Sequence, residues 1–515
     1  MLRFGTAGLR GPLQEGPDGM NVDTVSQASA GIADWLRNRC LGGGLVIVGR
    51  DARHGSAEFA LATAEVFAAA GFTVLELPRP LPTPIVAYAV RALGAVAGVQ
   101  ITASHNPATD NGYKLYLDGG SQLVPPADAE IERCIDTVTG TIPRKDAAAT
   151  APNPSILGLP AAATITDMGE EIVHRYLARV AELPGRIGGS GDRADIRIAL
   201  TAMHGVGGEL ATAALRAAGF GEVLVVSEQF APDPDFPTVS FPNPEEPGAS
   251  DRLLDLAERL DADIAIALDP DADRCAVGVR GSNGWRMLRG DETGVLLGDF
   301  VLRTAAPDSL VATTIVSSRL LSKLAPARGA RYAETLTGFK WLARAGDGLV
   351  YAYEEAIGHC VDPSTVRDKD GISAAVLAAD LIAQLKAQGR TVDDALDALA
   401  IEFGVHAGDQ ISLRLADAAE AAKVVERLRE TPPAEIAGEK VTCVDMSQLR
   451  GQMRTDALVF EGDSLRVVIR PSGTEPKLKC YVEVVQPVPT PEDLPAAKAT
   501  AAQQLSEIRA FCEKL

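Results

Sequence analysis

The chain has 515 residues, 46% of them hydrophobic and 23% charged, a balance that indicates folded globular domains and excludes a disordered protein. Its length is enough for roughly three or four domains, and no uncharged apolar stretch reaches the roughly 18 residues that a membrane span needs. The formal charge of −20 argues against binding to nucleic acid or to an anionic membrane, so an anionic substrate would need a local cluster of cations, backbone donors and metal.

Short apolar runs alternate with helical patterns through most of the chain. The first series predicts a strand at 45–48, a helix from Ser56 to just before Gly71, a strand at 72–77, a helix from about 85 and a strand at 95–101. The same alternation recurs at 196–200, 209–218, 223–226, 251–260 and 263–268, and again from about 292 to 386. It is typical of largely parallel or mixed sheets covered by helices.

The last hundred residues follow an α+β pattern instead. Strands are predicted near 410–414, 464–469 and 478–485, and helices near 416–430 and 491–513. A Pro- and Ala-rich stretch at 143–163 is typical of a linker, and weaker boundaries fall near 288 and 405. We therefore expect three similar α/β domains with mixed sheets at 1–160, 161–288 and 289–405, and a C-terminal α+β domain at 406–515.

The segment TASHNPATDNGYKLY places Ser104 just after a predicted strand, in a loop with His105, and Lys114 follows in the same segment. Ligand sites of α/β proteins gather at the carboxyl ends of strands, so Ser104 is a candidate nucleophile. The alternative is a surface turn with a capping serine. A hydrolase-type serine is disfavoured because the G-x-S-x-G elbow is missing.

The segment IAIALDPDADRCAV ends an apolar strand in Asp269, Asp271 and Asp273. Carboxylates at alternate positions can converge on one hard cation, and three are too few for a calcium cage but suit Mg²⁺ that shares a phosphate oxygen. An EF-hand is excluded because Arg274 and Arg280 stand where its glycine and its final glutamate belong. The alternative is an acidic turn, although three clustered carboxylates repel one another without a cation.

The segment RPSGTEPK, residues 470–477, offers a guanidinium, two hydroxyls, a glycine and Lys477, the donors of a phosphate cradle. It is not a Walker motif, and a hairpin turn is the alternative. The weaker segments ETLTGFKW and YEEAIGH could hydrogen-bond sugar hydroxyls or form helix caps. Arg10, Arg50 and Arg53 could each contact an anion or form a structural ion pair.

Together these segments resemble the α-D-phosphohexomutase superfamily, which includes phosphoglucomutases and phosphomannomutases. FGTAGLRG, TASHNP, DPDADR, TGFK, EEAIG and RPSGTEP occur in the family's order across nearly the whole chain. The resemblance implies a four-domain, heart-shaped fold around a central cleft. It also implies an intramolecular phosphotransferase that interconverts a sugar 1-phosphate and 6-phosphate, with glucose the first expectation, through a phosphoserine and a bisphosphorylated sugar.

The resemblance assigns a role to each motif. It makes Ser104 the phosphorylated residue, which would hold Mg²⁺ together with Asp269, Asp271 and Asp273. The residues that it implies for sugar binding are Thr337, Gly338, Phe339, Lys340, Glu354 and Glu355. Those that it implies for binding the non-transferred phosphate are Arg470, Ser472, Gly473, Thr474 and Lys477. The charged residues that it implies near the transferred group are Arg10, His105, Lys114 and Arg274. Either Lys114 or His105 could be the general base.

Two positions depart from the common pattern of this superfamily. Ala356 stands where many hexomutases have a sugar-contacting serine, and Phe339 stands where bifunctional phosphomannomutase/phosphoglucomutases have histidine. Both look more like the phosphoglucomutase branch that also includes phosphopentomutases. Phosphomannomutase and phosphopentomutase activities are therefore alternatives to phosphoglucomutase activity.

Two other functional classes are alternatives to a mutase. A metal-dependent sugar phosphatase could use the aspartates, but it leaves Ser104 without a role. A non-catalytic sugar-phosphate-binding protein would have no use for three aspartates beside a nucleophile. The expected partners are a small-molecule sugar phosphate and glucose 1,6-bisphosphate as activator, in a monomer or homodimer. Seven scattered cysteines and an N-terminus without a secretory signal favour a reducing cytoplasm.

Overall fold

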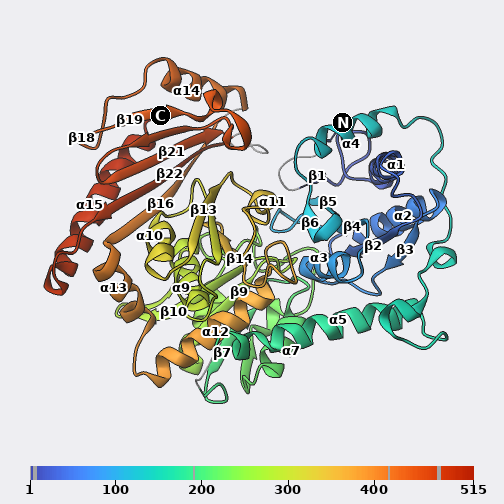
Figure 1. Cartoon of the computed structure of the whole chain (residues 1–515), viewed down its shortest axis with the longest axis horizontal. Helices are drawn as coiled ribbons and strands as arrows, with labels where there is room; N and C mark the ends of the chain where they lie inside the picture. The colour runs from blue at the N-terminus through green and yellow to red at the C-terminus, as the bar shows by residue number, and fades with distance from the viewer. Residues whose placement is uncertain (1, 4–7, 189–191, 416–417, 472–476) are drawn as a thin grey trace. The chain divides into compact units, whose positions relative to one another are not determined.

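The structure is a computed structural model that describes residues 2–3, 8–188, 192–415, 418–471 and 477–515. The chain divides into two compact units (Figure 1), of which the first is Met1–Ala306 with Gly338–Gly389 and the second is Pro307–Thr337 with Arg390–Leu515. Within the described ranges, no helix combines the length and the apolarity needed to cross a membrane.

The first unit begins with a mixed six-stranded sheet of order β1-β5-β4-β2-β3, in which β6 also pairs with β5. Its strands are β1 (Leu9–Pro12), β2 (Leu45–Arg50), β3 (Thr73–Glu76), β4 (Ala97–Ile101), β5 (Asp110–Leu117) and β6 (Ser121–Gln122), and its helices are α1 (Val22–Asn38), α2 (Ser56–Ala69), α3 (Thr83–Ala92) and α4 (Ala127–Thr137). The strands β3 and β4 run parallel to β2, whereas β5 is antiparallel to both of its main neighbours, β1 and β4.

Successive side chains of each strand point to opposite faces of this sheet, and each face is covered by different helices. Val46 and Val48 on β2 belong to the buried core formed with α1 and α2. On the opposite face, glycines allow α3 to approach closely, since a Cβ added at Gly98 would lie 2.3 Å from Val90 Cγ2. The result is an α/β/α layer structure in which the parallel strands β2 and β4 end at Arg50 and Ile101.

A second, five-stranded sheet of order β11-β10-β9-β7-β8 follows. Its strands are β7 (Arg197–Thr201), β8 (Glu222–Val225), β9 (Ile264–Leu268), β10 (Cys275–Gly281) and β11 (Gly284–Met287), and the helices around it are α5 (Ile165–Ala181), α6 (Leu183–Arg186), α7 (Gly208–Ala217), α8 (Asp251–Leu260) and α12 (Gly371–Ala387). Helix α5 contacts α3 of the first layer and α7 of the second, so it bridges the two sheets within this unit (Figure 1).

The region between the second sheet and the C-terminal domain is shared by the two units. The first unit holds α9 (Gly290–Leu302), α11 (Phe339–Leu342) and the antiparallel pair β14 (Leu349–Glu354) and β15 (Gly358–Cys360). The second unit holds the parallel pair β12 (Leu310–Thr314) and β13 (Arg331–Thr335), with α10 (Leu320–Ala327) and α13 (Val392–Phe403).

The C-terminal domain is an antiparallel sheet of order β16-β22-β21-β20-β19. Its elements are β16 (Val405–Arg414), α14 (Ala418–Glu430), β17 (Glu435–Ile436), β18 (Glu439–Lys440), β19 (Thr442–Asp445), β20 (Leu458–Glu461), β21 (Leu465–Pro471), β22 (Lys477–Gln486) and α15 (Leu494–Cys512). Helices α14 and α15 share one buried core with the sheet (Figure 1), for example through Val425, Ile469 and Ile508.

The predicted fold class is confirmed: mixed α/β sheets precede a C-terminal α+β domain. The predicted helix from Ser56 is α2, and the predicted strands at 464–469 and 478–485 are β21 and β22. The stretch predicted as a linker, 143–163, contains only short 3-10 helices at Ala147–Thr150 and Pro154–Leu157. The sequence patterns do not predict β5, a strand that contributes to the site because it carries Lys114. The domain limits stay predictions.

Candidate active site

Ser104 lies three residues beyond the end of β4, in a tight and buried loop. Its φ of 53° is unusual for a residue with a side chain, and its backbone N–H donates to Thr102 Oγ1 at 2.9 Å. The serine is only 1% exposed. The loop therefore fixes the direction of the hydroxyl and does not leave it in a solvated turn, which was the alternative interpretation of this segment.

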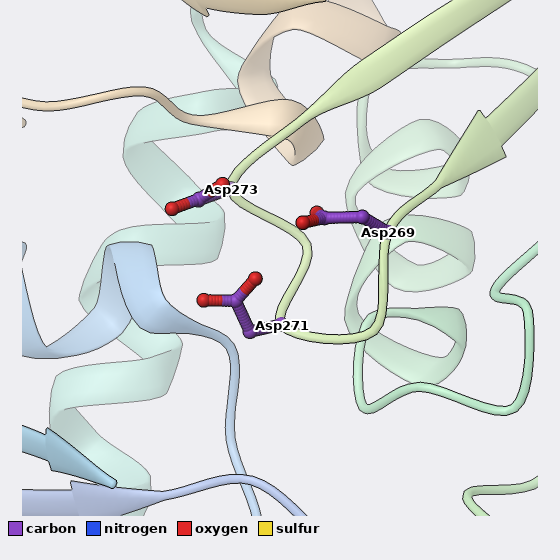
Figure 2. Close-up of side chains that lie close together, drawn as sticks. All are labelled: Asp269, Asp271 and Asp273. Carbon is purple, nitrogen blue, oxygen red and sulfur yellow. The ribbon is translucent and has the colours of Figure 1, made fainter. Parts of the chain in front are cut away.

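The three aspartates occupy the short connection between β9 and β10. Figure 2 shows the carboxylates of Asp269, Asp271 and Asp273 pointing toward a common space, and one oxygen of each lies within 4.8 Å of the others. All three residues are buried. Ser104 Oγ donates to Asp269 Oδ2 at 2.7 Å, so the structure brings together two motifs that stand 165 positions apart in the chain.

Two lysines offset the charge of this cluster. Lys114 on β5 donates from Nζ to Asp271 Oδ2 and to Asp273 Oδ2, each at 2.6 Å. Lys369, in the loop before α12, places Nζ 3.1 Å from Asp273 Oδ2. Thr83, at the start of α3, donates from Oγ1 to Asp271 Oδ2 at 2.5 Å. Three buried carboxylates can stay close together because these donors surround them.

The carboxylates differ in their proton affinity. Burial raises the pKa of Asp269 well above its usual value, and repulsion from Asp271 and Asp273 adds to the rise. Burial also favours the neutral form of Asp271, but the charge and hydrogen bond of Lys114 outweigh it and the pKa falls below the usual range. The pKa of Asp273 is lowered as well, because Lys114 and Lys369 outweigh burial and the charge of Asp271.

The donor set fits a divalent cation. Asp271 Oδ1 and Asp273 Oδ1 are buried and accept no hydrogen bond from any described residue, while the Oδ2 atoms of the same side chains are bonded to Lys114. Each of these carboxylates thus keeps one oxygen for a ligand role and has the other oriented by a lysine. Hard cations such as Mg²⁺ prefer carboxylate oxygen, so the three aspartates could hold one.

The other charged residues predicted near the transferred group also lie around this cluster. Arg274 donates its backbone N–H to Asp269 Oδ1 at 3.0 Å and its Nη1 to Ala356 O at 3.2 Å. Arg10 Nη1 lies 3.4 Å from Asn106 Oδ1, an amide in the Ser104 loop. His105 Nδ1 is buried without a hydrogen-bond partner among the described residues, and burial, with Arg274 nearby, lowers its pKa well below the usual value.

Part of the predicted sugar-binding set lies in the same unit. Glu354, at the end of β14, is 9% exposed, and its Oε1 is 4.0 Å from Arg274 Nη2; burial raises its pKa. Phe339 is buried, and its ring centroid lies 5.4 Å from Lys369 Nζ. Lys340 is also buried, and desolvation lowers its pKa. Gly338 precedes α11 with a φ of 104°, and Glu355 lies in the turn that follows β14.

The remaining predicted residues belong to the second unit. Arg470 on β21 donates from Nη1 to Thr337 Oγ1 at 2.8 Å, so two separately predicted binding residues meet there. Lys477 begins β22. Ser472, Gly473 and Thr474 lie outside the described residues.

Two side chains at the cluster, Thr83 and Lys369, were not predicted. Thr83 carried no usable signal, since Thr-Pro at a helix start is common. Lys369 stands in the segment VRDKDG, where four charged residues precede an apolar helix. Its 6% exposure is rare for a lysine, and such a run could have been recognised as a buried ionic cluster.

Family models match most of the chain. The phosphoglucomutase/phosphomannomutase models match in order: α/β/α domain I at residues 1–141, domain II at 174–282, domain III at 289–403 and the C-terminal domain at 411–496. The chain belongs to the phosphoglucomutase/phosphomannomutase family. It is an isomerase of the phosphohexomutase type, as the motifs predicted.

Curated relatives of this mutase carry different sugar names. A "Probable phosphomannomutase" of Haemophilus influenzae is 42% identical over 90% of this chain and 93% of its own length. A "Probable phosphoribomutase" of Schizosaccharomyces pombe is 34% identical, covering 93% of this chain and 86% of its own. A phosphoglucomutase of Staphylococcus aureus is 31% identical, covering 94% and 90%. The sugar is thus open, and these relatives lend no support to the phosphatase alternative.

A solved structure agrees with the fold of the mutase. The open form of parafusin, a phosphoglucomutase from Paramecium, superposes with a TM-score of 0.74 at 20% identity, covering 99% of this chain and 95% of that one. At this identity the likeness concerns the fold alone.

Proposed function

We propose that this mutase interconverts glucose 1-phosphate and glucose 6-phosphate through a phosphoserine at Ser104 and a bisphosphorylated sugar. The observation that carries the proposal is the 2.7 Å hydrogen bond from Ser104 Oγ to Asp269, inside a buried cluster of carboxylates and cations. A serine so placed can carry a phosphoryl group beside a metal ion, whereas a phosphatase that uses an aspartate nucleophile would have no role for it.

Each half-reaction transfers one phosphoryl group. The bond between Ser104 Oγ and phosphorus breaks as the free hydroxyl of a sugar monophosphate forms a new bond to phosphorus. The hydroxyl's proton passes to Lys114 or His105, and Ser104 Oγ takes up one proton as it leaves phosphorus. The bisphosphate then turns over, its other phosphoryl group returns to Ser104, and the isomer leaves.

Charge is the main obstacle to this chemistry. A phosphoserine carries about −1.5 to −2 charge, and a second phosphate must approach it. Asp269, Asp271 and Asp273 would hold Mg²⁺, which when bound supplies positive charge at the transferring group. Lys114, Lys369 and Arg274 already surround the carboxylates, so the chain's own cations add to that stabilisation.

The non-transferred phosphate needs a second site. We assign it to Arg470 and Lys477 together with residues 472–474, and the sugar hydroxyls to Glu354, Glu355 and the segment 337–340. Glucose 1,6-bisphosphate would serve as activator because it can phosphorylate Ser104.

Phosphopentomutase activity is the second candidate. It is favoured by the relative named phosphoribomutase, by Phe339 and by Ala356, while the relative named phosphomannomutase keeps mannose in the comparison. A measurement of kcat/KM for glucose 1-phosphate, mannose 1-phosphate and ribose 1-phosphate, each with its bisphosphate, decides among them. A preference of at least tenfold for ribose 1-phosphate would replace the glucose assignment.

Intact-mass measurement tests the phosphoserine. The purified protein should contain a fraction heavier by one phosphoryl group, and Ser104→Ala should lack both this fraction and mutase activity. Ser155→Ala is the matched control, because Ser155 is exposed in a 3-10 helix. Unchanged mutase activity in Ser104→Ala would contradict the proposal.

A further inference from the structure

From the sequence, Arg53 could contact an anion or form a structural ion pair, but the proposed mechanism gives it no role. Its side chain is 1% exposed and lies beneath residues 104–110, which we call the serine loop. Nη2 donates to Ser104 O and Asn106 O, both at 2.6 Å. Nη1 donates to Pro107 O at 2.7 Å and Asp110 O at 3.1 Å. One guanidinium thus binds four carbonyl oxygens of a seven-residue loop.

The remaining donor of Arg53 faces a buried carboxylate. Nε lies 3.3 Å from Asp51 Oδ2, and Asp51 in turn accepts hydrogen bonds from Ser56 Oγ at 2.6 Å and from the backbone N–H of Arg53 at 3.0 Å. A guanidinium has five N–H donors in a rigid plane. The four N–H groups of Nη1 and Nη2 are hydrogen-bonded to the loop carbonyls, and Nε faces Asp51 in a buried ion pair without a hydrogen bond among the described residues, so Arg53 has no exposed donor left for a substrate phosphate.

A second segment covers the face of this guanidinium. Phe236 belongs to residues 231–250, which we call the covering loop and which precede α8 in the second sheet's domain. Its ring centroid lies 4.9 Å from Arg53 Cζ, and the residue is 4% exposed. Its φ is 45°, a conformation that a bulky residue adopts only where its surroundings hold it.

We propose that Arg53 is a positioning residue for the phosphoryl transfer: it sets the geometry of Ser104 by binding the carbonyls of the serine loop, and Phe236 holds it in place. The inference rests on the proposed role of Ser104. It differs from a role in charge or in substrate binding, because a lysine keeps the charge but its three donors radiate from one point and cannot span four carbonyls.

The test uses full-length Arg53→Lys, Arg53→Ala and Phe236→Leu, with His54→Gln as the matched control. His54 is the next residue, and its exposed Nε2 lies 2.7 Å from Asp235 Oδ1 in the covering loop. A displacement of about 1 Å at a reacting group costs roughly 100-fold. We therefore expect both Arg53 variants to lose about 100-fold in kcat, with KM for the sugar phosphate changed by less than about threefold. We expect Phe236→Leu to lose about threefold to tenfold in kcat, and His54→Gln to keep wild-type kcat.

Rescue separates positioning from a merely structural role. Millimolar guanidinium should raise the kcat of Arg53→Ala by about tenfold or more. Methylammonium supplies the charge without the planar fork of donors, so it should leave this kcat unchanged. Wild-type kcat in Arg53→Lys would overturn the inference, as would a rise in KM at unchanged kcat or a loss in Arg53→Ala that guanidinium leaves unrestored. If Arg53→Ala does not fold, the kcat and KM of Arg53→Lys and Phe236→Leu decide: a loss of kcat at unchanged KM supports the inference, and wild-type kcat overturns it.

The intact mass of the wild type distinguishes this failure from failure of the proposed function. A phosphorylated wild type whose Arg53 variants behave as wild type overturns only the role of Arg53. An active wild type that never carries phosphoserine overturns both.

Discussion

Gly205→Ala should displace the loop that carries the three aspartates. Gly205 is buried, and a Cβ at this position would lie 2.3 Å from Pro270 Cα and 2.4 Å from Pro270 O. Ordinary carbon–carbon contacts are about 3.5 Å, so Pro270 must move by about 1 Å. Pro270 stands between Asp269 and Asp271, and its carbonyl accepts a hydrogen bond from the backbone N–H of Val206 at 2.8 Å.

The structure sets the size of the expected effect. Overpacking of this kind costs about 1–3 kcal/mol of stability, and a shift of about 1 Å at a reacting centre costs roughly 100-fold in rate. The φ of Gly205 lies outside the left-handed region, so backbone strain does not add to the steric effect. We expect kcat to fall about 100-fold, and the Mg²⁺ concentration that gives half-maximal activity to rise.

The assay is steady-state kinetics across a Mg²⁺ titration, with urea unfolding to measure stability. Gly185→Ala is the matched control, because no atom lies within 4 Å of a Cβ at Gly185, in the short helix α6. A Gly205→Ala protein with wild-type kcat and wild-type Mg²⁺ dependence would refute the reasoning, since it would mean that the aspartate loop tolerates such a shift.

Two further predictions concern proton transfer and stability. Lys114→Met should lower kcat by roughly 10²- to 10⁴-fold and His105→Gln by less, in initial-rate assays; the reverse order would assign the base to His105. Glu483 bonds to Arg319 Nε at 2.6 Å and His406 Nδ1 at 3.0 Å. Burial favours its neutral form, but these partners outweigh burial and hold the pKa at about 2, against 4.5 ordinarily. This gap stabilises the fold by roughly 3 kcal/mol above pH 4.5, and the stabilisation is lost as the pH falls toward 2. Urea midpoints of Glu483→Gln and wild type should therefore differ most at pH 7 and converge in acid, and a difference that is constant with pH would contradict the assignment.

Local features of the candidate site were readable from the sequence. Three aspartates at alternate positions after an apolar run share one short turn, so their spacing indicates that they lie close together, and their mutual repulsion indicates that cations must lie beside them. Ser104 likewise lies just beyond the end of a predicted strand. Short-range dihedral preferences and period-two alternation decide such features within a few residues, and the family motifs added the roles.

Contacts between distant segments were decided only by the tertiary structure. The sequence left Arg53 open between an anion contact and an ion pair, and packing against the serine loop directs its donors to backbone carbonyls. It did not indicate that Lys369 joins Lys114 at Asp273. Only the family resemblance, and no local pattern, implied that Ser104 lies beside Asp269. Such encounters depend on how the helices and sheets bury their apolar faces against one another, a long-range balance of core packing that no local run of residues contains.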